Sequence, residues 1–288
     1  MRWRDWAGLA IVAALAGTGV RGQTAAAPAL RDTHENLHGL LWMQTAAEYQ
    51  AITRGLYRLA AVQLDRALLE PRWTAIPEQA GRADLALLKP AVILDVDETV
   101  LDNSPEEGQR VRDRVAYAPD LFRLWAAKTE AGTVPGASEF LKYAAARDVE
   151  IFLVTNRHPD WRDETIETLR KDGIPIAEDH VLCFGERGTA EDPGDKSGRR
   201  QFVASSHRVL LLAGDDLGDF VAIADGGKRL DRGARAALVD RFSGYWEERW
   251  FVLPNPVYGS WERTFYPAGT TDPDALAKKL EAVRGFRK

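Results

Sequence analysis

The chain has 288 residues, of which 45% are hydrophobic and 28% charged, a composition that excludes a disordered chain and fits one large α/β domain with a smaller attachment. The formal net charge is −5, and no run of Lys and Arg alternates with aromatic residues, so no polymeric nucleic-acid partner is expected. The only cysteine, Cys183, excludes an intramolecular disulfide. It lies in an apolar run, where a buried structural role is expected.

Residues 1–22 have the pattern of a signal peptide. Arg2 and Arg4 give a positive start, an apolar stretch runs from Ala7 to Val20, and small residues follow. The apolar stretch is shorter than the roughly 20 residues that span a bilayer, although a buried or membrane-anchoring helix remains the alternative. The sequence therefore predicts a protein that is periplasmic or secreted after cleavage.

Residues 30–85 are predicted to form an N-terminal helical region. Between Thr33 and Leu69 apolar residues recur at helical spacing, and Pro71 and Pro77 then interrupt the pattern.

Residues 86–270 are predicted to form the core of the protein. Short, almost continuous apolar runs that end in polar residues are typical of parallel strands covered on both faces. They are Ala91–Leu94 before Asp95, Ile151–Val154 before Thr155, and Val209–Ala213 before Gly214-Asp215.

Helical patterns lie between the apolar runs. They cover Gly136–Arg147 and Asp160–Lys171, and Gly173 is expected to end the second helix. This alternation predicts an α/β fold with a Rossmann-like, doubly wound parallel sheet and helices on both faces. Residues 104–135 are too long for a simple connection and contain Trp125, so a helical insertion that covers the crevice is predicted.

The segment from Asp95 to Thr99 is the most informative one. An apolar strand that runs into two carboxylates, Asp95 and Asp97, has no packing reason to do so. A carboxylate nucleophile splits phosphomonoester hydrolysis into two displacements through an aspartyl-phosphate. We predict that Asp95 attacks phosphorus, and that Asp97 protonates the leaving oxygen and then takes a proton from the attacking water.

A cation is required between the anionic nucleophile and a dianionic substrate. Mg²⁺ prefers oxygen ligands, which Asp95, Asp215 and the backbone carbonyl of Asp97 would supply, while Asp219 would hold metal-bound water. Whether Asp215 or Asp216 is the ligand is left open. The alternative for this segment is an acidic N-cap of a helix beginning near Leu217.

Further polar residues are candidates for binding the phosphate. Thr155 and Lys196 are suitable donors to its nonbridging oxygens, and Asn156 and Arg157 follow Thr155 directly. Taken alone, Lys196 is more simply a solvated loop lysine, and the role of Arg157 is ambiguous.

Several segments, in order, resemble the bacterial class C acid phosphatases of the lipoprotein e type, within the haloacid dehalogenase-like (HAD) superfamily. Asp95-x-Asp97-x-Thr99, Thr155, Lys196 and Gly214-Asp215-x₃-Asp219 are similar to the four motifs of HAD phosphatases. The flanking segments that narrow the resemblance are 41–49, 93–103, 154–157 and 253–262, and the resemblance spans about residues 36–266.

The resemblance implies a Rossmann-like core with a helical accessory region, a Mg²⁺ cofactor, a homodimer, and hydrolysis of nucleoside monophosphates and other phosphomonoesters outside the cytoplasm. Trp125 and Tyr258 are candidates for stacking on a substrate base, or else fill the core or a subunit interface. Lipoprotein members carry a lipidated cysteine after the signal peptide, and no cysteine precedes Cys183. No stable membrane anchor is therefore expected.

Two other functions on the same fold are alternatives to a phosphatase. A carbon–halogen or phosphonate hydrolase on the same core disagrees with Asp97, because a proton shuttle at that position serves an oxygen leaving group. A non-catalytic secreted binding or storage protein is opposed only by the intact set of site residues.

Overall fold

The computed structural model describes residues 34–187, 192–225, 228–267 and 269–284. The predicted signal peptide, residues 1–22, lies outside them. Among the described residues, no helix combines the length and the hydropathy that crossing a bilayer requires.

A five-stranded parallel sheet, in the order β5-β4-β1-β6-β9, forms the centre of the fold. The predicted apolar runs are confirmed as its three middle strands, and the short edge strands were not predicted. The strands are β1 (Lys89–Leu94), β4 (Glu150–Val154), β5 (Val181–Leu182), β6 (His207–Gly214) and β9 (Trp250–Val252).

Both faces of the sheet are covered by helices, as predicted. Because side chains alternate along a strand, Val92 and Leu94 of β1 enter one hydrophobic cluster while Ala91 and Ile93 enter the other. The first cluster also contains side chains of α2 (Ala47–Leu69), α5 (Ala137–Ala145) and α6 (Arg162–Lys171), and the second contains those of α7 (Ser197–Ser206). Cys183 is confirmed as a buried core residue, and burial raises the pKa of its thiol.

The N-terminal region forms two helices. Ala46, whose backbone is extended, separates α1 (Leu37–Thr45) from α2. The Tyr57 hydroxyl of α2 donates to the Thr99 carbonyl over 2.6 Å. At Gly136, which begins α5 with φ +99°, a Cβ would lie 3.1 Å from Tyr57 Cβ, so a side chain there would be crowded. Helix α2 thus packs closely on α5 and holds the loop after β1.

Helix α6 ends at Lys171, and Gly173, the glycine predicted to end it, follows its C-cap with φ +69°. The N–H groups of Gly173 and Ile174 donate to the carbonyls of Arg170 and Leu169, which satisfies the last turn of the helix.

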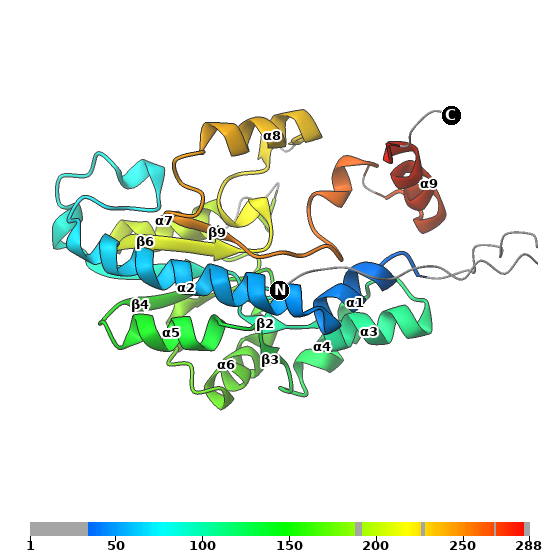
Figure 1. Ribbon diagram of the computed structural model, residues 1–288, viewed down its shortest axis with the longest axis horizontal. Helices are drawn as coiled ribbons and strands as arrows, with labels where there is room; N and C mark the ends of the chain where they lie inside the picture. The colour runs from blue at the N-terminus through cyan, green and yellow to red at the C-terminus, as the bar shows by residue number, and fades with distance from the viewer. Residues whose placement is uncertain (1–33, 188–191, 226–227, 268, 285–288) are drawn as a thin grey trace, which may run out of the picture. The chain divides into compact units, whose positions relative to one another are not determined.

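The segment after β1 holds two helices, α3 (Ser104–Asp113) and α4 (Pro119–Ala126). Strand β2 (Leu101–Asp102) pairs with β3 (Gly132–Thr133) in an antiparallel hairpin that brackets these helices. Helices α1, α3 and α4 group at one end of the sheet, together with β2 and β3 (Figure 1). Because β2 follows β1, this is the end where the carboxyl termini of the strands lie.

The remaining elements are short or peripheral. They are β7 (Ala224–Asp225), β8 (Lys228–Arg229), α8 (Arg232–Arg241), α9 (Asp272–Ala282) and the 3₁₀ turns η1 (Pro77–Gln79), η2 (Leu85–Leu87), η3 (Pro159–Trp161), η4 (Glu178–His180), η5 (Leu217–Asp219) and η6 (Glu262–Thr264).

Candidate active site

Asp95 lies at the carboxyl end of β1, next to the middle of the sheet. Its backbone N–H donates to the Ala213 carbonyl of β6 over 2.9 Å, so the position of the residue is fixed by the strand pairing. The carboxylate is buried and forms an ion pair with Lys196 Nζ at 2.6 Å. The predicted nucleophile is therefore buried, and the ammonium of Lys196 lies beside it.

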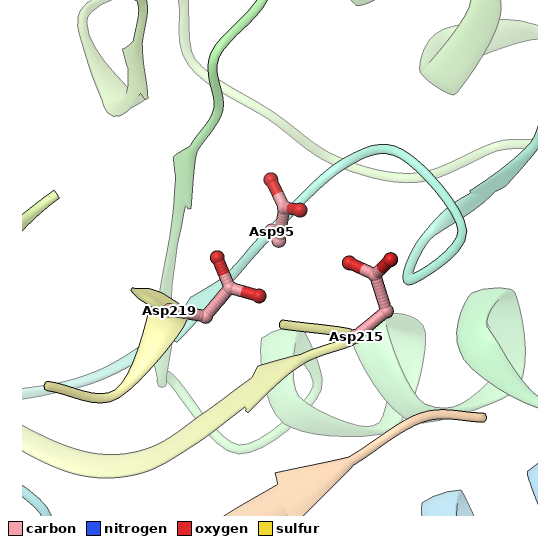
Figure 2. Close-up of side chains that lie close together, drawn as sticks. All are labelled: Asp95, Asp215 and Asp219. Carbon is pink, nitrogen blue, oxygen red and sulfur yellow. The ribbon is translucent and has the colours of Figure 1, made fainter. Parts of the chain in front are cut away.

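Asp215 and Asp219 join Asp95 in one acidic cluster. Each residue offers an oxygen, and these oxygens lie within 4.8 Å of one another. Figure 2 shows the three carboxylates gathered around one space. Gly214 permits this arrangement, because a Cβ at that position would lie 2.2 Å from Asp219 Oδ2.

The carboxylate of Asp216 is engaged elsewhere. It caps η5 by accepting from Gly218 N–H at 2.8 Å, and it accepts from the N–H and the hydroxyl of Ser260 at 2.6 Å. The segment that the sequence assigned to an acidic N-cap or a metal ligand provides the cap through Asp216 and places Asp215 in the acidic cluster. The geometry thus favours Asp215 over Asp216 as a ligand.

Lys196 is buried, in contrast to the solvated loop lysine considered from sequence alone. Its ammonium lies 2.6 Å from both Asp95 Oδ1 and Asp219 Oδ1. Burial opposes the charged form, but Asp219 and Asp95 outweigh it, so the pKa of Lys196 lies above its usual value. This lysine is positively charged at any physiological pH.

Burial and mutual repulsion disfavour the charged form of the carboxylates in the cluster. Burial raises the pKa of Asp95 to about 7, an effect that Lys196 opposes and that Asp219 and Asp97 reinforce. Burial also raises the pKa of Asp215, to which Asp95 and Asp219 add repulsion. The ammonium of Lys196 contacts two of the three carboxylates, so negative charge is in excess in the cluster. A divalent cation bound by oxygen ligands fits these residues.

Asp97 faces a different set of partners. Its Oδ1 accepts from Asn103 Nδ2 at 2.8 Å and from Arg157 Nε at 2.9 Å. Thr155 Oγ1 lies 3.5 Å from its Oδ2. The structure therefore brings two of the predicted site residues, Thr155 and Arg157, to Asp97.

Arg157 and Asn156 have positions that the sequence did not predict. The guanidinium of Arg157 is buried, and besides Asp97 it donates to Thr165 Oγ1 and Asn103 Oδ1. Asn156 is exposed, and its Oδ1 accepts from the buried Arg199 at 2.8 Å. The contacts of the Arg157 guanidinium thus place it beside Asp97.

The two predicted stacking residues lie in different surroundings. Trp125 of α4 is half-buried, and its indole N–H donates to Asn103 Oδ1 at 2.9 Å. Tyr258 is also half-buried and packs against a hydrophobic cluster that includes Leu40 and Met43 of α1.

Two asparagines that sequence reasoning missed each donate to a site carboxylate. Asn103 Nδ2 contacts Asp97, and Asn255 Nδ2 donates to Asp215 Oδ2 at 2.8 Å. The available signal was their place in the segments 93–103 and 253–262, which carry the resemblance. Sequence reasoning also missed the buried guanidinium of Arg200, which donates to the carbonyls of Gly218 and Asp219.

The chain is similar to known acid phosphatases in sequence and in structure. The family model described as HAD superfamily, subfamily IIIB (acid phosphatase), matches residues 33–261. The class C acid phosphatase from Bacillus anthracis is similar in structure, with a TM-score of 0.74 and 30% identity over 88% of this chain and 98% of that chain. The class C acid phosphatase of that organism with tungstate bound has a TM-score of 0.75 at the same identity and coverage.

Proposed function

This chain belongs to subfamily IIIB of the HAD superfamily, the acid phosphatases, and from that premise we propose how its residues hydrolyse phosphomonoesters. The family match confirms the predicted phosphomonoesterase, and it favours the enzyme over a non-catalytic binding or storage protein. The observation that carries the residue assignment is the cluster of Asp95, Asp215 and Asp219, in which Asp95 and Asp219 are buried and pair with the ammonium of Lys196.

In the proposed first step, an Asp95 oxygen attacks phosphorus while the bond to the leaving oxygen breaks. Asp97 gives its proton to that oxygen, so the product leaves as an alcohol. Lys196 and Thr155 are the donors that would offset negative charge on the nonbridging oxygens. The result is an aspartyl-phosphate on Asp95 and an ionised Asp97.

In the second step, water attacks the phosphorus of the aspartyl-phosphate. Asp97 takes a proton from that water, phosphate leaves, and Asp95 returns to a carboxylate. Both carboxyl groups thus end in the state in which they began. Tungstate, which is bound in the related Bacillus anthracis structure, is an oxyanion like phosphate and supports this substrate class.

Asp95, Asp215 and the backbone carbonyl of Asp97 are the groups that we expect to hold Mg²⁺, with Asp219 oriented toward its water ligands. The charge that the ion supplies would offset repulsion between the cluster and a dianionic substrate. Asn255, which donates to Asp215, would orient that ligand.

Turnover of p-nitrophenyl phosphate with and without chelator tests this assignment. Activity should vanish on chelation and return with Mg²⁺. Asp215→Asn should raise the Mg²⁺ concentration needed for half activity by at least about tenfold, since a carboxylate ligand is lost. Asp216→Asn is the matched control, because Asn caps helices as well as Asp does. An equal effect of the two substitutions would contradict the choice of Asp215.

We propose nucleoside monophosphates as preferred substrates, with Trp125 and Tyr258 stacking on the base at roughly 1–3 kcal/mol per ring. Tyr258→Ala and Trp125→Ala should then raise KM for nucleotides and leave KM for glycerol phosphate unchanged. Trp125→Phe keeps an aromatic ring and should preserve nucleotide binding. An equal loss on both substrates would make the two rings structural.

We also propose that the protein is exported, that residues 1–22 are removed, and that the product is free of the membrane. The support is the charged start and apolar stretch, with no cysteine ahead of Cys183 to be acylated. The intact mass of the exported protein tests cleavage, and fractionation with membranes after a high-salt wash would contradict the proposal. The homodimer that the resemblance implies stays a prediction, which light scattering can test.

A further inference from the structure

The two oxygens of Asp97 are treated differently by their neighbours. Oδ1 lies 2.8 Å from Asn103 Nδ2, 2.9 Å from Arg157 Nε and 2.8 Å from Arg157 Nη2. Among the residues that the structure describes, the only hydrogen bond to Oδ2 comes from the Thr155 hydroxyl, at 3.5 Å. Because three N–H donors point at Oδ1, a proton on the neutral carboxyl resides on Oδ2.

Asn103 is buried, and both polar ends of its side chain are engaged. Its Oδ1 accepts from Trp125 Nε1 at 2.9 Å and from Arg157 Nη2 at 3.2 Å, while its Nδ2 donates to Asp97. An indole and a guanidinium only donate, and a carboxylate only accepts, so the amide has one possible orientation. The side chain is therefore a fixed link between the insertion and Asp97.

The backbone of Asn103 is fixed as well. Its N–H donates to Glu98 Oε1 at 2.8 Å. Glu98 is buried and has φ +54°, a left-handed conformation that is strained for a residue other than glycine. Such strain persists where the surrounding structure enforces it, and it is often found beside active sites. The turn after β1 thus places Asn103 within reach of the carboxyl that it contacts.

We propose that Asn103 is the positioning residue of Asp97, and that it directs Oδ2 to carry the proton exchanged with the leaving group and with water. The inference rests on the proposed function, in which Asp97 is the proton-transferring group. Asn103 acts only through Asp97. Trp125 extends the link to α4, so the helical segment between β2 and β3 also takes part in orienting Asp97.

The leaving group provides a test that a merely structural role would not affect. An alkyl alcohol such as glycerol needs protonation as it leaves, whereas p-nitrophenolate leaves readily without it. Loss of proton transfer, which is worth about 10²–10⁴-fold, should therefore lower kcat/KM for glycerol phosphate far more than for p-nitrophenyl phosphate. The quantity to measure is the ratio of the two kcat/KM values, which reports the first step.

Asn103→Asp keeps an acceptor for Trp125 and Arg157 but replaces the donor to Asp97 with a carboxylate oxygen and adds a charge, so Asn103→Ala, which removes the donor without adding charge, is measured beside it. We expect the kcat/KM ratio to shift against glycerol phosphate by at least about tenfold, a part of the full contribution of proton transfer. Asn103→Ala should act in the same direction. Trp125→Phe, which loses only the indole donor, should shift the ratio less, and it tests the link even if the Asn103 variants fail to fold.

Asn255→Asp is the matched control, since Asn255 donates to Asp215 as Asn103 donates to Asp97. It should slow both substrates equally and change the Mg²⁺ requirement. Thermal unfolding confirms that each variant is folded. If Asp97→Asn shifts the ratio but neither Asn103→Asp nor Trp125→Phe does, the positioning role is overturned while the proposed function stands. If Asp97→Asn itself leaves the ratio unchanged, the assigned role of Asp97 fails, and the inference fails with it.

Discussion

The two ends of the same parallel sheet treat polar groups in opposite ways. At the carboxyl end, three carboxylates lie close together with the ammonium of Lys196 beside two of them, and burial, reinforced by their mutual repulsion, raises the pKa values of Asp95 and Asp215. At the amino end, Gln79 is buried with both ends of its amide paired. Glu150 there faces Lys89 and His207 at 3.3 and 2.8 Å.

This contrast separates stability from function within one set of strands. At the amino end, Gln79 and Glu150 are paired with protein partners, so they contribute to the free energy of folding. The carboxyl end keeps an excess of negative charge, which a bound divalent cation would offset. Residues at one end should therefore control stability with little effect on turnover, and residues at the other should do the reverse.

The largest expected effect is the loss of turnover in Asp95→Asn, because an amide cannot form the aspartyl-phosphate. Activity on p-nitrophenyl phosphate should fall below about a hundredth of the wild-type value, since nucleophile loss should exceed what acid–base help contributes. The protein should remain folded by circular dichroism. A folded variant with more activity than this would remove Asp95 from the role of nucleophile.

At the opposite end, Gln79→Leu should lower stability and spare activity. The amide accepts from Thr74 Oγ1 and the Val209 N–H, and it donates to the carbonyls of Ala204 and His207. Leucine leaves these buried groups unpaired, at a cost of about 2–4 kcal/mol in urea unfolding.

Gln50→Leu is the control for Gln79→Leu. It makes the same exchange at an exposed site on α2 and should stay within about 0.5 kcal/mol of the wild type. A drop in kcat/KM for Gln79→Leu comparable to that of a site variant would show that the two ends are not separable.

The raised pKa of Asp95, about 7, predicts how the metal-free protein depends on pH. An unfolded Asp titrates near about 3.9, so between roughly pH 4 and 7 the folded state binds more protons at this residue than the unfolded state does. This contribution to the free energy of unfolding therefore decreases as pH rises through that window. In Asp95→Asn the contribution is absent.

In chelator, the stability of Asp95→Asn relative to the wild type should thus rise with pH, by at most about 1.4 kcal/mol per unit for one carboxyl. Urea unfolding of both proteins at pH 5 and pH 7 measures the change. A difference that stays constant, or that shrinks as pH rises, would show that Asp95 is not held in an unfavourable environment.

The sequence predicted which residues lie at the carboxyl end of the sheet, but not which hydrogen bonds they form there. Asp95 and Asp215 could be placed because apolar strands end at them, and parallel strands bring their carboxyl ends to one edge. The short edge strands β5 and β9 could not, since two or three residues show no period. The division of the N-terminal region into two helices at Ala46 could not be predicted either, because the spacing of apolar residues does not change there.

The partners of the site residues depend on tertiary structure. Arg157 looks like a substrate ligand in sequence, yet it turns to Asp97 and Thr165, from an adjacent loop and from α6. The position of Asn103 depends on the left-handed backbone conformation of Glu98, and a glutamate in the sequence does not predict that conformation. Sequence predicts where chemistry-bearing residues leave the strands, and cross-element hydrogen bonds then determine what each one contacts.

The smallest expected effect is that of Glu150→Gln, which keeps a hydrogen-bonding group and removes a charge at the amino end. Glu150 is partly buried, which raises its pKa, but Lys89 and His207 outweigh this, so the pKa lies below its usual value. A carboxyl with a lowered pKa stabilises the fold above its unfolded pKa, near about 4.3, and loses that contribution as pH falls through the folded pKa. Solvent screening limits the effect to below about 1 kcal/mol, so the variant should be slightly less stable at pH 7 and equal to the wild type near pH 3. Thermal unfolding at the two pH values measures this, and unchanged phosphatase activity would separate Glu150 from the carboxylates at the other end of the sheet. A deficit that persists at pH 3 would mean that packing, rather than charge, holds Glu150 in place.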